Sequence, residues 1–198
     1  MNLVGLDIGE KTGFCGLVLD DKYNVVGSEV KEITVVELNE FFVFNLARAV
    51  EEAIVAFNAD FVVIEGYGYG GKGFFNVMQA ELTGQVKRMM VDTGISFYEV
   101  PISSLRYAVL NNGRANKGDA KKFAQEFFKK HNLILPKSNE YHFTDAVIPA
   151  VLAVMFVQGT HSEEFERRIA ESVIGGCHER SIFSLLERYR ERDTESVS

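Results

Sequence analysis

Residues 2–13 read NLVGLDIGEKTG, an apolar run that contains one carboxylate, Asp7, and leads into a glycine-containing turn. A run this short is typical of a buried strand, and the apolar run at 14–19 that follows predicts a hairpin. A charge in a buried strand is costly unless it is paired or binds a metal. Asp7 therefore either caps the turn between Gly9 and Thr12 or belongs to a site that other parts of the chain complete.

The first third of the chain predicts a meander and a crossover. Strands are expected at 2–8, 13–20 and 24–33, and apolar residues at helical spacing predict a helix at 37–57. A continuous apolar run then leads into Glu65, as expected for a strand that is covered on both faces. A strand, a helix and a buried strand form a crossover unit, so the strand before Glu65 should lie parallel to the first.

The second half predicts four helices and one strand. The helices are expected at 74–93, 103–110, 117–131 and 141–157, with the strand at 95–100. Gly84 lies inside the first of these helices, where it costs about 1 kcal/mol relative to alanine unless a close helix crossing requires it. Ser103 or Ser104 should cap the second helix, and Pro149 should kink the last one or mark its first turn. The class is α/β, with a mixed five-stranded sheet, three antiparallel strands then parallel strands, flanked by helices.

Composition indicates an ordinary soluble domain with an appendage. The chain has 198 residues, of which 46% are hydrophobic and 25% charged, and we expect one domain at 1–158. Residues 159–198 mix charged and apolar residues and predict an amphipathic helical extension with a disordered end. We find no secretory signal and no run long enough to span a bilayer. Two distant cysteines fit a reducing compartment, so a cytoplasmic location and no membrane contact are expected.

The charge distribution points to an anionic ligand on one part of the surface. The net charge of −7 argues against a nonspecific nucleic-acid coat, yet residues 106–137 hold eight basic and two acidic residues. This block is either a candidate anion-binding face or a solvated helix face.

The segment 66–75 has five glycines within residues 66–73 and four aromatic residues between 67 and 75. It lacks the Gly-Lys-Ser/Thr end of a phosphate-binding P-loop. Aromatic side chains on such a loop suit stacking on bases, and the alternative is a connection whose aromatics fold back onto the core.

Four acidic or imidazole side chains are candidates for one site. Asp7 and Glu65 follow two strands that should be neighbours, and His142 and Asp145 share one face of an apolar helix. Such ligands on separate elements suit hard divalent metals, and two ions roughly 3.5–4 Å apart can clamp a phosphodiester displacement. A buried His–Asp pair that bonds internally is the alternative for the last two.

These residues resemble those of the RuvC Holliday-junction resolvases, within the ribonuclease H-like fold. The resemblance covers residues 2–157. Leu6-Asp7-Ile8-Gly9 is similar to the family's first catalytic strand, and Ile64-Glu65 to its glutamate at a strand end. The stretch 112–117, NGRANK, resembles Asn-Gly-Arg-Ala-x-Lys, and 142–146, HFTDA, resembles the last motif. The loop after Glu65 and the tail are longer than in bacterial members, which suggests a phage-encoded or otherwise divergent chain.

The resemblance implies a homodimeric endonuclease that makes paired symmetric nicks in four-way DNA junctions and leaves 3′-hydroxyl and 5′-phosphate ends. It implies two Mg²⁺ ions per active site, with Mn²⁺ as a substitute. The implied metal ligands are Asp7, Glu65, His142 and Asp145, and Lys117 joins them as a catalytic residue. The candidate DNA-binding residues are Arg106, Arg114, Lys117, Lys121, Lys122, Tyr67, Tyr69, Lys72, Phe74 and Phe75. The candidate dimer-interface residues are Met78, Leu82, Val86, Met89 and Met90.

Three other functions fit parts of the pattern. A nuclease of the same fold could act on flaps or other branched DNA, and a related module could bind branched DNA without cutting it. The turn at 7–13 also resembles the first phosphate motif of actin-like and sugar-kinase ATPases. Such chains need a second strand-turn of this kind and an adenosine pocket, and the sequence has neither.

Overall fold

The computed structural model describes residues 1–36, 41–66, 74–136 and 142–160. Within these residues, five strands and five helices follow one another in the predicted order, with bounds within a few residues of those expected. The strands are β1 (Asn2–Asp7), β2 (Thr12–Leu19), β3 (Val25–Ile33), β4 (Phe61–Gly66) and β5 (Ser96–Pro101). The helices are α1 (Phe42–Ala56), α2 (Phe74–Thr93), α3 (Ile102–Leu110), α4 (Lys117–Lys130) and α5 (His142–Gln158).

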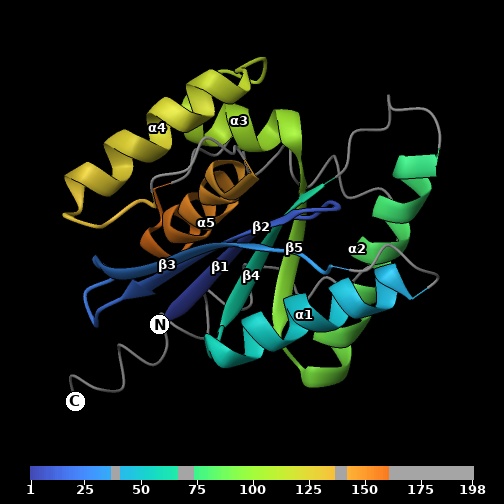
Figure 1. Ribbon diagram of the computed structural model, residues 1–198. Helices are drawn as coiled ribbons and strands as arrows, with labels where there is room; N and C mark the ends of the chain where they lie inside the picture. The colour runs from blue at the N-terminus through green and yellow to red at the C-terminus, as the bar shows by residue number, and fades with distance from the viewer. Residues whose placement is uncertain (37–40, 67–73, 137–141, 161–198) are drawn as a thin grey trace.

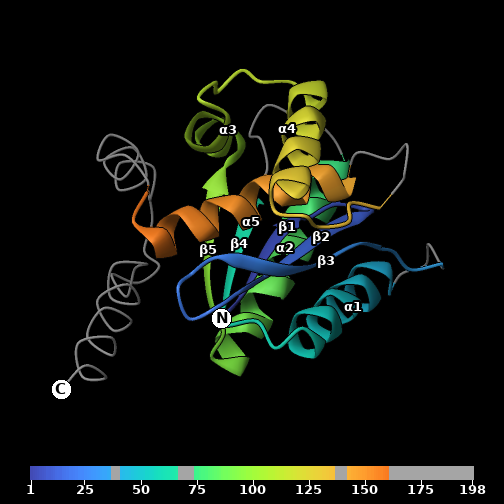
Figure 2. The ribbon, with the colours of Figure 1, turned by 90° about the vertical axis from the view of Figure 1, so that its left-hand side faces the viewer.

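The strands form one mixed sheet in the order β3-β2-β1-β4-β5. Strand β1 pairs antiparallel with β2 and parallel with β4, and β4 pairs parallel with β5. The predicted central position of the first strand beside the strand of Glu65 is therefore confirmed, as is the mixed five-stranded sheet. Helices α1 and α2 cover one face, while α5 crosses the other face beneath α3 and α4 (Figures 1 and 2).

The alternation of side chains along the strands divides the core into two. On β1, Val4, Leu6 and Ile8 pack with α1 and α2, whereas Leu3 packs with α5 on the opposite face. Every second residue of a strand points to the same face, so Gly5 and Asp7 lie on the α5 side with Leu3. The sheet thus presents its one acidic position on β1 to the apolar helix α5.

Gly5 allows α5 to lie directly on the sheet. A Cβ at position 5 would overlap the carbonyl oxygen of Ala146 and the amide nitrogen of Ala150. Both atoms belong to the backbone of α5, so no rotation of a side chain relieves the overlap. This close approach fixes the first turns of α5 over the end of β1.

Several local predictions are wrong. Helix α3 begins after Pro101 without a side-chain cap, so neither Ser103 nor Ser104 serves as one. Pro149 lies inside α5, beyond its first turn, so it does not mark that turn, and the alternative, a kink, stays a prediction. Gly84 faces open space among the described residues, so none of the described helices crosses α2 at this position.

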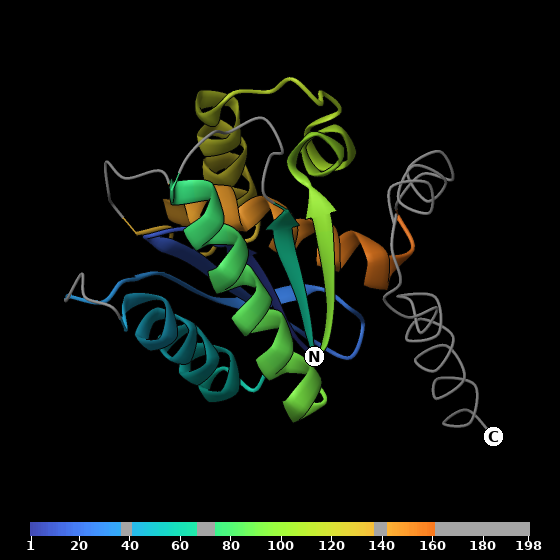
Figure 3. The ribbon, with the colours of Figure 1, turned by 90° about the vertical axis from the view of Figure 1, so that its right-hand side faces the viewer.

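The predicted dimer-interface residues also need correction. Met78, Leu82, Val86 and Met90 are at most 9% exposed and pack against α1 and the sheet, and Met89 is partly buried beside them. Their helical spacing reflects burial in the chain's own core. Helix α2 runs beside α1 in Figure 3. The exposed side of α2 carries Val77, Gly84 and Val91 instead.

Some predictions fall outside the described residues. These concern the start of the predicted 37–57 helix, the loop at 67–73 and the extension from residue 161 onward. The division of the chain at residue 158 therefore stays a prediction. Within the described segments, none of the helices has the length and apolar character that crossing a membrane requires.

Candidate active site

Asp7 and Glu65 lie side by side at the ends of two central strands. In the parallel ladder between β1 and β4, Asp7 is the register partner of Glu65. Both side chains are on the face that α5 covers, because each continues the alternation of its strand. Neighbouring strands are about 4.8 Å apart, so the backbone alone holds the two carboxylates close together.

Helix α5 brings a third carboxylate to this edge. Asp145 precedes Ala146, the residue whose carbonyl lies over Gly5, and its side chain is only 4% exposed. Its charge acts on both Asp7 and Glu65. The predicted convergence of these three acids is therefore seen in the structure.

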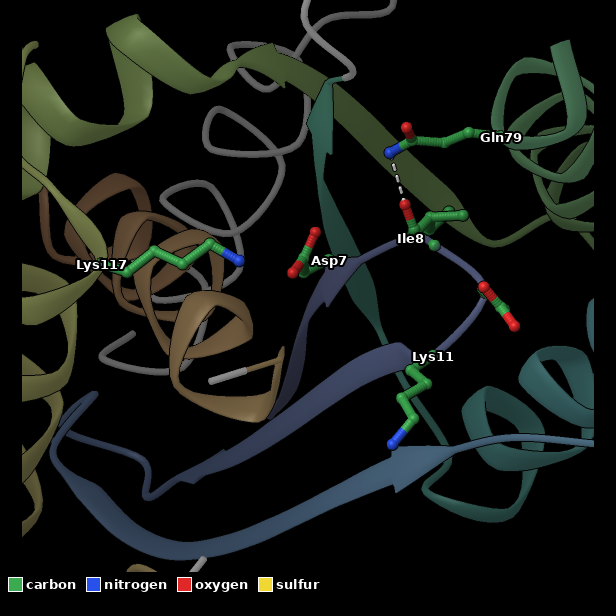
Figure 4. A pocket seen from close by; sticks show the side chains of 7 residues that line it. Asp7, Ile8, Lys11, Gln79 and Lys117 are labelled. Carbon is green, nitrogen blue, oxygen red and sulfur yellow. Dashed lines mark hydrogen bonds between the residues drawn. The ribbon is translucent and has the colours of Figure 1, made fainter. Parts of the chain in front are cut away.

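Lys117 forms an ion pair with the third of these acids. Its Nζ lies 3.6 Å from Oδ2 of Asp145, and its side chain is 58% exposed. Asn116 and Asp119 form a capping box that fixes the start of α4 at Lys117. In Figure 4 the amine of Lys117 points toward the carboxylate of Asp7 across the cleft.

A cleft of about 330 Å³ opens beside Asp7. It is lined by the β1–β2 turn (residues 7–11), by Gln79 of α2 and by Lys117. The cleft therefore borders Asp7 on one side. Its lining carries both signs of charge, as a site for a phosphate group and a cation needs.

Burial and mutual repulsion disfavour the ionised forms of the acids. Loss of solvation, together with the charge of Asp145, raises the pKa of Asp7 from 3.8 to about 7. Loss of solvation and the charges of Asp7 and Asp145 raise the pKa of Glu65 from 4.5 to about 8. Lys117 and Arg106 oppose both shifts. Two neighbouring acids with such strongly raised pKa values mark a functional-site candidate.

These pKa shifts predict how stability depends on pH in the absence of divalent cations. The folded state holds protons on Asp7 and Glu65 that the unfolded chain releases near pH 4. This contribution to stability is complete below pH 4 and is lost as pH rises through about 7 and 8. In EDTA, we expect the melting temperature of Asp7→Asn to exceed that of the wild type at pH 8.5 by more than at pH 5. Calorimetry at both pH values, with the exposed Asp21→Asn as control, checks this.

The donor set fits a hard divalent cation. Asp7, Glu65 and Asp145 offer carboxylate oxygens, the ligands such ions prefer, and a dication would offset the repulsion that raises their pKa values. In the described part of the chain, no three His, Cys, Asp or Glu side chains form a ready-made metal group. Asp145 forms an ion pair with Lys117 in the structure. Binding of a cation therefore requires the three carboxylates to move closer to one another around the ion.

The other predicted basic residues lie around α3 and α4. Arg114, Lys117 and Lys122 are exposed and Lys121 is partly buried. Arg106 is turned inward, where its Nη1 donates to the carbonyl of Ala115 at 2.7 Å. It therefore holds the segment before α4 and faces the acids, and does not lie on the open surface with the lysines.

The remaining predicted site residues are not placed by the structure. Tyr67, Tyr69 and Lys72 lie outside the described residues. His142, Phe74 and Phe75 belong to the first turns of α5 and α2, and their side chains lie outside the description. Their roles stay predictions.

Sequence reasoning missed two residues near the site, because neither belongs to a recognisable motif. Gly5 sits in the quoted opening stretch, but an unbroken apolar strand gives no sign that a helix lies on it. Gln79 donates to the carbonyl of Ile8 at 2.6 Å, a bond that joins residues 71 positions apart. A lone glutamine in an amphipathic helix has no sequence signal, so only the fold identifies it.

Comparison with solved structures identifies the fold. The Thermus thermophilus RuvC structure has a TM-score of 0.64 and 17% identity, over 82% of this chain and 99% of that chain. The yeast mitochondrial Holliday junction resolvase has a TM-score of 0.55 and 9% identity, over 86% and 80%. The fowlpox virus Holliday junction resolvase has a TM-score of 0.54 and 14% identity, over 78% and 98%.

The bacterial and viral proteins have also been solved with Holliday junction substrate. No family model and no curated protein sequence matches the chain. At these identities the likeness shows a shared fold, so the predicted ribonuclease H-like fold of the RuvC type is confirmed.

Proposed function

We propose that this chain, which shares the fold of RuvC, is a metal-dependent endodeoxyribonuclease that resolves four-way DNA junctions. The observation that carries the proposal is the register pairing of Asp7 with Glu65, opposite Asp145, in that fold. One buried carboxylate, Asp145, and two partly buried ones, Asp7 and Glu65, have no role in packing and cost stability. Such a cost is typical of a site kept for its chemistry.

Asp7, Glu65, Asp145 and His142 would hold divalent cations, Mg²⁺ or Mn²⁺, at this edge of the sheet. Two such ions activate a water molecule and neutralise charge on the phosphate that is attacked. Asp7, between the other two acids, is suited to be shared by both ions. His142 is either a fourth ligand or a proton carrier near them.

Lys117 would face the phosphate that reacts. Its amine reaches Asp145 from the first turn of α4 and borders the cleft beside Asp7. An ammonium held there stabilises charge that builds on the phosphate oxygens during the displacement. The products would be 3′-hydroxyl and 5′-phosphate ends.

The basic residues at the start of α4 would hold the DNA backbone. Lys121 and Lys122 follow Lys117 by one turn, so they extend the positive side of the cleft. Arg114 precedes the helix on the same connection. In an acidic protein, this local positive surface supplies the attraction to phosphates.

This role predicts a change in the salt dependence of junction binding. Replacing Lys121 and Lys122 together by alanine should make the slope of log K against log salt shallower by roughly 2, because each lost phosphate contact removes about 0.9. Lys129→Ala with Lys130→Ala, at the far end of α4, is the matched control. Fluorescence anisotropy with a synthetic junction measures both slopes, and equal slopes would contradict the assignment.

Paired incision needs two active sites in fixed geometry, which a twofold dimer supplies. We assign the dimer contact to the exposed stripe of α2 formed by Val77, Glu81, Gly84, Arg88 and Val91. Val77 and Val91 are 65% and 64% exposed, and none of the residues that the structure describes covers Gly84. A glycine at the middle of an apolar-ended stripe allows two helices to approach closely.

Gly84 gives a test that separates dimer from monomer. In a monomer, Gly84→Ala should stabilise the helix by about 1 kcal/mol, and Gly84→Arg should be tolerated. In the proposed dimer, Gly84→Arg should shift the protein to monomers while the melting curve stays cooperative. Sedimentation velocity at micromolar concentration measures the oligomeric state, with Val55→Arg on α1 as the control. A wild-type protein that is monomeric both with and without junction DNA would contradict the proposed dimer.

The direct test of the proposed function is cutting of a synthetic four-way junction. With Mg²⁺, the wild type should make two symmetric nicks that can be religated. Cutting of flaps without cutting of junctions would assign another branched substrate, and binding without cutting would leave a binding module. ATP hydrolysis that survives Glu65→Gln would favour an ATPase.

A further inference from the structure

We propose that Gln79 on α2 is a positioning residue for Asp7, and that it sets the affinity of the site for divalent cations. The inference rests on the proposed function, since it needs Asp7 to be a cation ligand. It assigns a role to a side chain outside the acids and the basic residues. Its basis is the bond from Gln79 to the residue that follows Asp7.

The backbone after Asp7 has left the sheet. Asp7 is the last residue of β1 in both ladders, paired with Gly13 on one side and Glu65 on the other. The carbonyl of Ile8 is held by Nε2 of Gln79 at 2.6 Å (Figure 4). The side chain of Ile8 is 1% exposed in the core beside α2.

The turn beyond Ile8 is closed on itself. Thr12 Oγ1 donates to the carbonyl of Gly9 at 3.0 Å, and Thr12 is completely buried. Gln79 is therefore the link between this closed turn and the helix packed beside it. It lines the same cleft as Asp7, on the side opposite Lys117.

A carboxylate that binds a cation must be held closely. Productive geometry tolerates shifts of only about 0.5 Å and 10–20°, and ligands achieve this through partners that do not touch the ion. Loss of such a partner typically costs about 10–100-fold in metal affinity or activity. Gln79 fixes the peptide plane between Ile8 and Gly9, one residue beyond Asp7, and so restricts how far the end of β1 and the carboxylate on it can shift.

The bond of Gln79 joins α2 to the end of β1, one residue beyond Asp7. Helix α2 covers the face of the sheet opposite α5, which carries Asp145. A donor at this place therefore anchors the end of β1 from the face opposite Asp145.

The test is a Mn²⁺ titration followed by electron paramagnetic resonance, without DNA. Gln79→Met keeps the length of the side chain and removes the donor. We expect it to weaken Mn²⁺ binding about 10–100-fold and to raise the Mg²⁺ concentration for half-maximal junction cutting by a similar factor. Gln79→Asn keeps the amide at a shorter reach and should fall between Gln79→Met and the wild type.

Gln85→Met is the control, because Gln85 lies on the same helix about 9 Å further along and outside the residues that line the cleft. Its Mn²⁺ affinity should equal that of the wild type. A merely structural role would lower the urea midpoint of Gln79→Met in EDTA without moving its Mn²⁺ affinity, and that result overturns the inference. If the wild type cuts, Asp7→Asn does not, and Gln79→Met binds Mn²⁺ normally, then only this inference fails. A wild-type protein that binds Mn²⁺ without cutting DNA would contradict the proposed function. The Mn²⁺ titration of Gln79→Met would then still decide whether Gln79 sets the cation affinity.

Discussion

Asp7→Asn should bind a four-way junction and fail to cut it. The asparagine side chain keeps the size of aspartate and loses its charge, so a ligand between two cation positions is removed with little change in packing. Loss of several kcal/mol of charge stabilisation in the transition state corresponds to a rate at least about 10³-fold lower. The measurement is single-turnover cleavage of a labelled synthetic junction in Mg²⁺, beside an anisotropy titration of the same junction.

The structure supports the retention of binding. Asp7 lies among the acids that Lys117 and Arg106 partly neutralise, so removing one negative charge should not weaken attraction for phosphates. Asp21→Asn, in the exposed β2–β3 turn, is the matched control and should cut like the wild type. Undiminished cutting by Asp7→Asn would contradict the proposed chemistry, because no other acid stands at the end of β1.

Gly5→Ala should destabilise the protein by roughly 3 kcal/mol or more. The added methyl group overlaps backbone atoms of Ala146 and Ala150, and forcing an extra group into a closely packed core commonly costs about 1–3 kcal/mol. Here the cost should exceed the usual range, since a whole helix has to move. Urea unfolding followed by circular dichroism gives the difference.

Gly27→Ala is the control for strand propensity. Its new methyl group would meet only the side chain of Val18 at 3.4 Å, an ordinary contact. We expect Gly5→Ala also to lose activity at temperatures where it remains folded, because α5 carries Asp145 toward Asp7. A Gly5→Ala protein as stable as the wild type would show that α5 does not rest on β1 as described.

Much of the fold could be predicted because it follows from local patterns. Apolar runs and helical spacing depend on residues near one another, and they placed β1, β4 and α2 within a residue or two. The crossover rule then put β1 beside β4, and the alternation of strands put Asp7 and Glu65 on one face. Those steps need no knowledge of side-chain packing.

The errors arose where a pattern has two physical causes. Met78, Leu82 and Val86 recur at helical spacing, which marks a buried face without saying what buries it. The sheet and α1 bury them, so the interface prediction was wrong. The cap of α3 failed because Pro101 ends β5 immediately before the helix, and leaves Ser103 and Ser104 inside it.

The contacts of Gln79 and the inward turn of Arg106 depend on distant parts of the chain. Gln79 meets a residue 71 positions away, and Arg106 bonds the carbonyl of Ala115 beyond a turn. Hydrogen bonds of this kind are set by where elements come to lie, which residue spacing does not encode.

The register pairing of Asp7 with Glu65 has a consequence for how such proteins diversify. The separation of the two acids is set by hydrogen bonds of a ladder in the middle of the sheet, and neither connecting loop contributes to it. Segments outside this ladder, such as residues 67–73, can therefore change in length and composition while the distance between the acids stays constant. Under the proposed function, natural variation and engineering could then alter which DNA shape enters the site and leave the acids that would cut the strand unchanged.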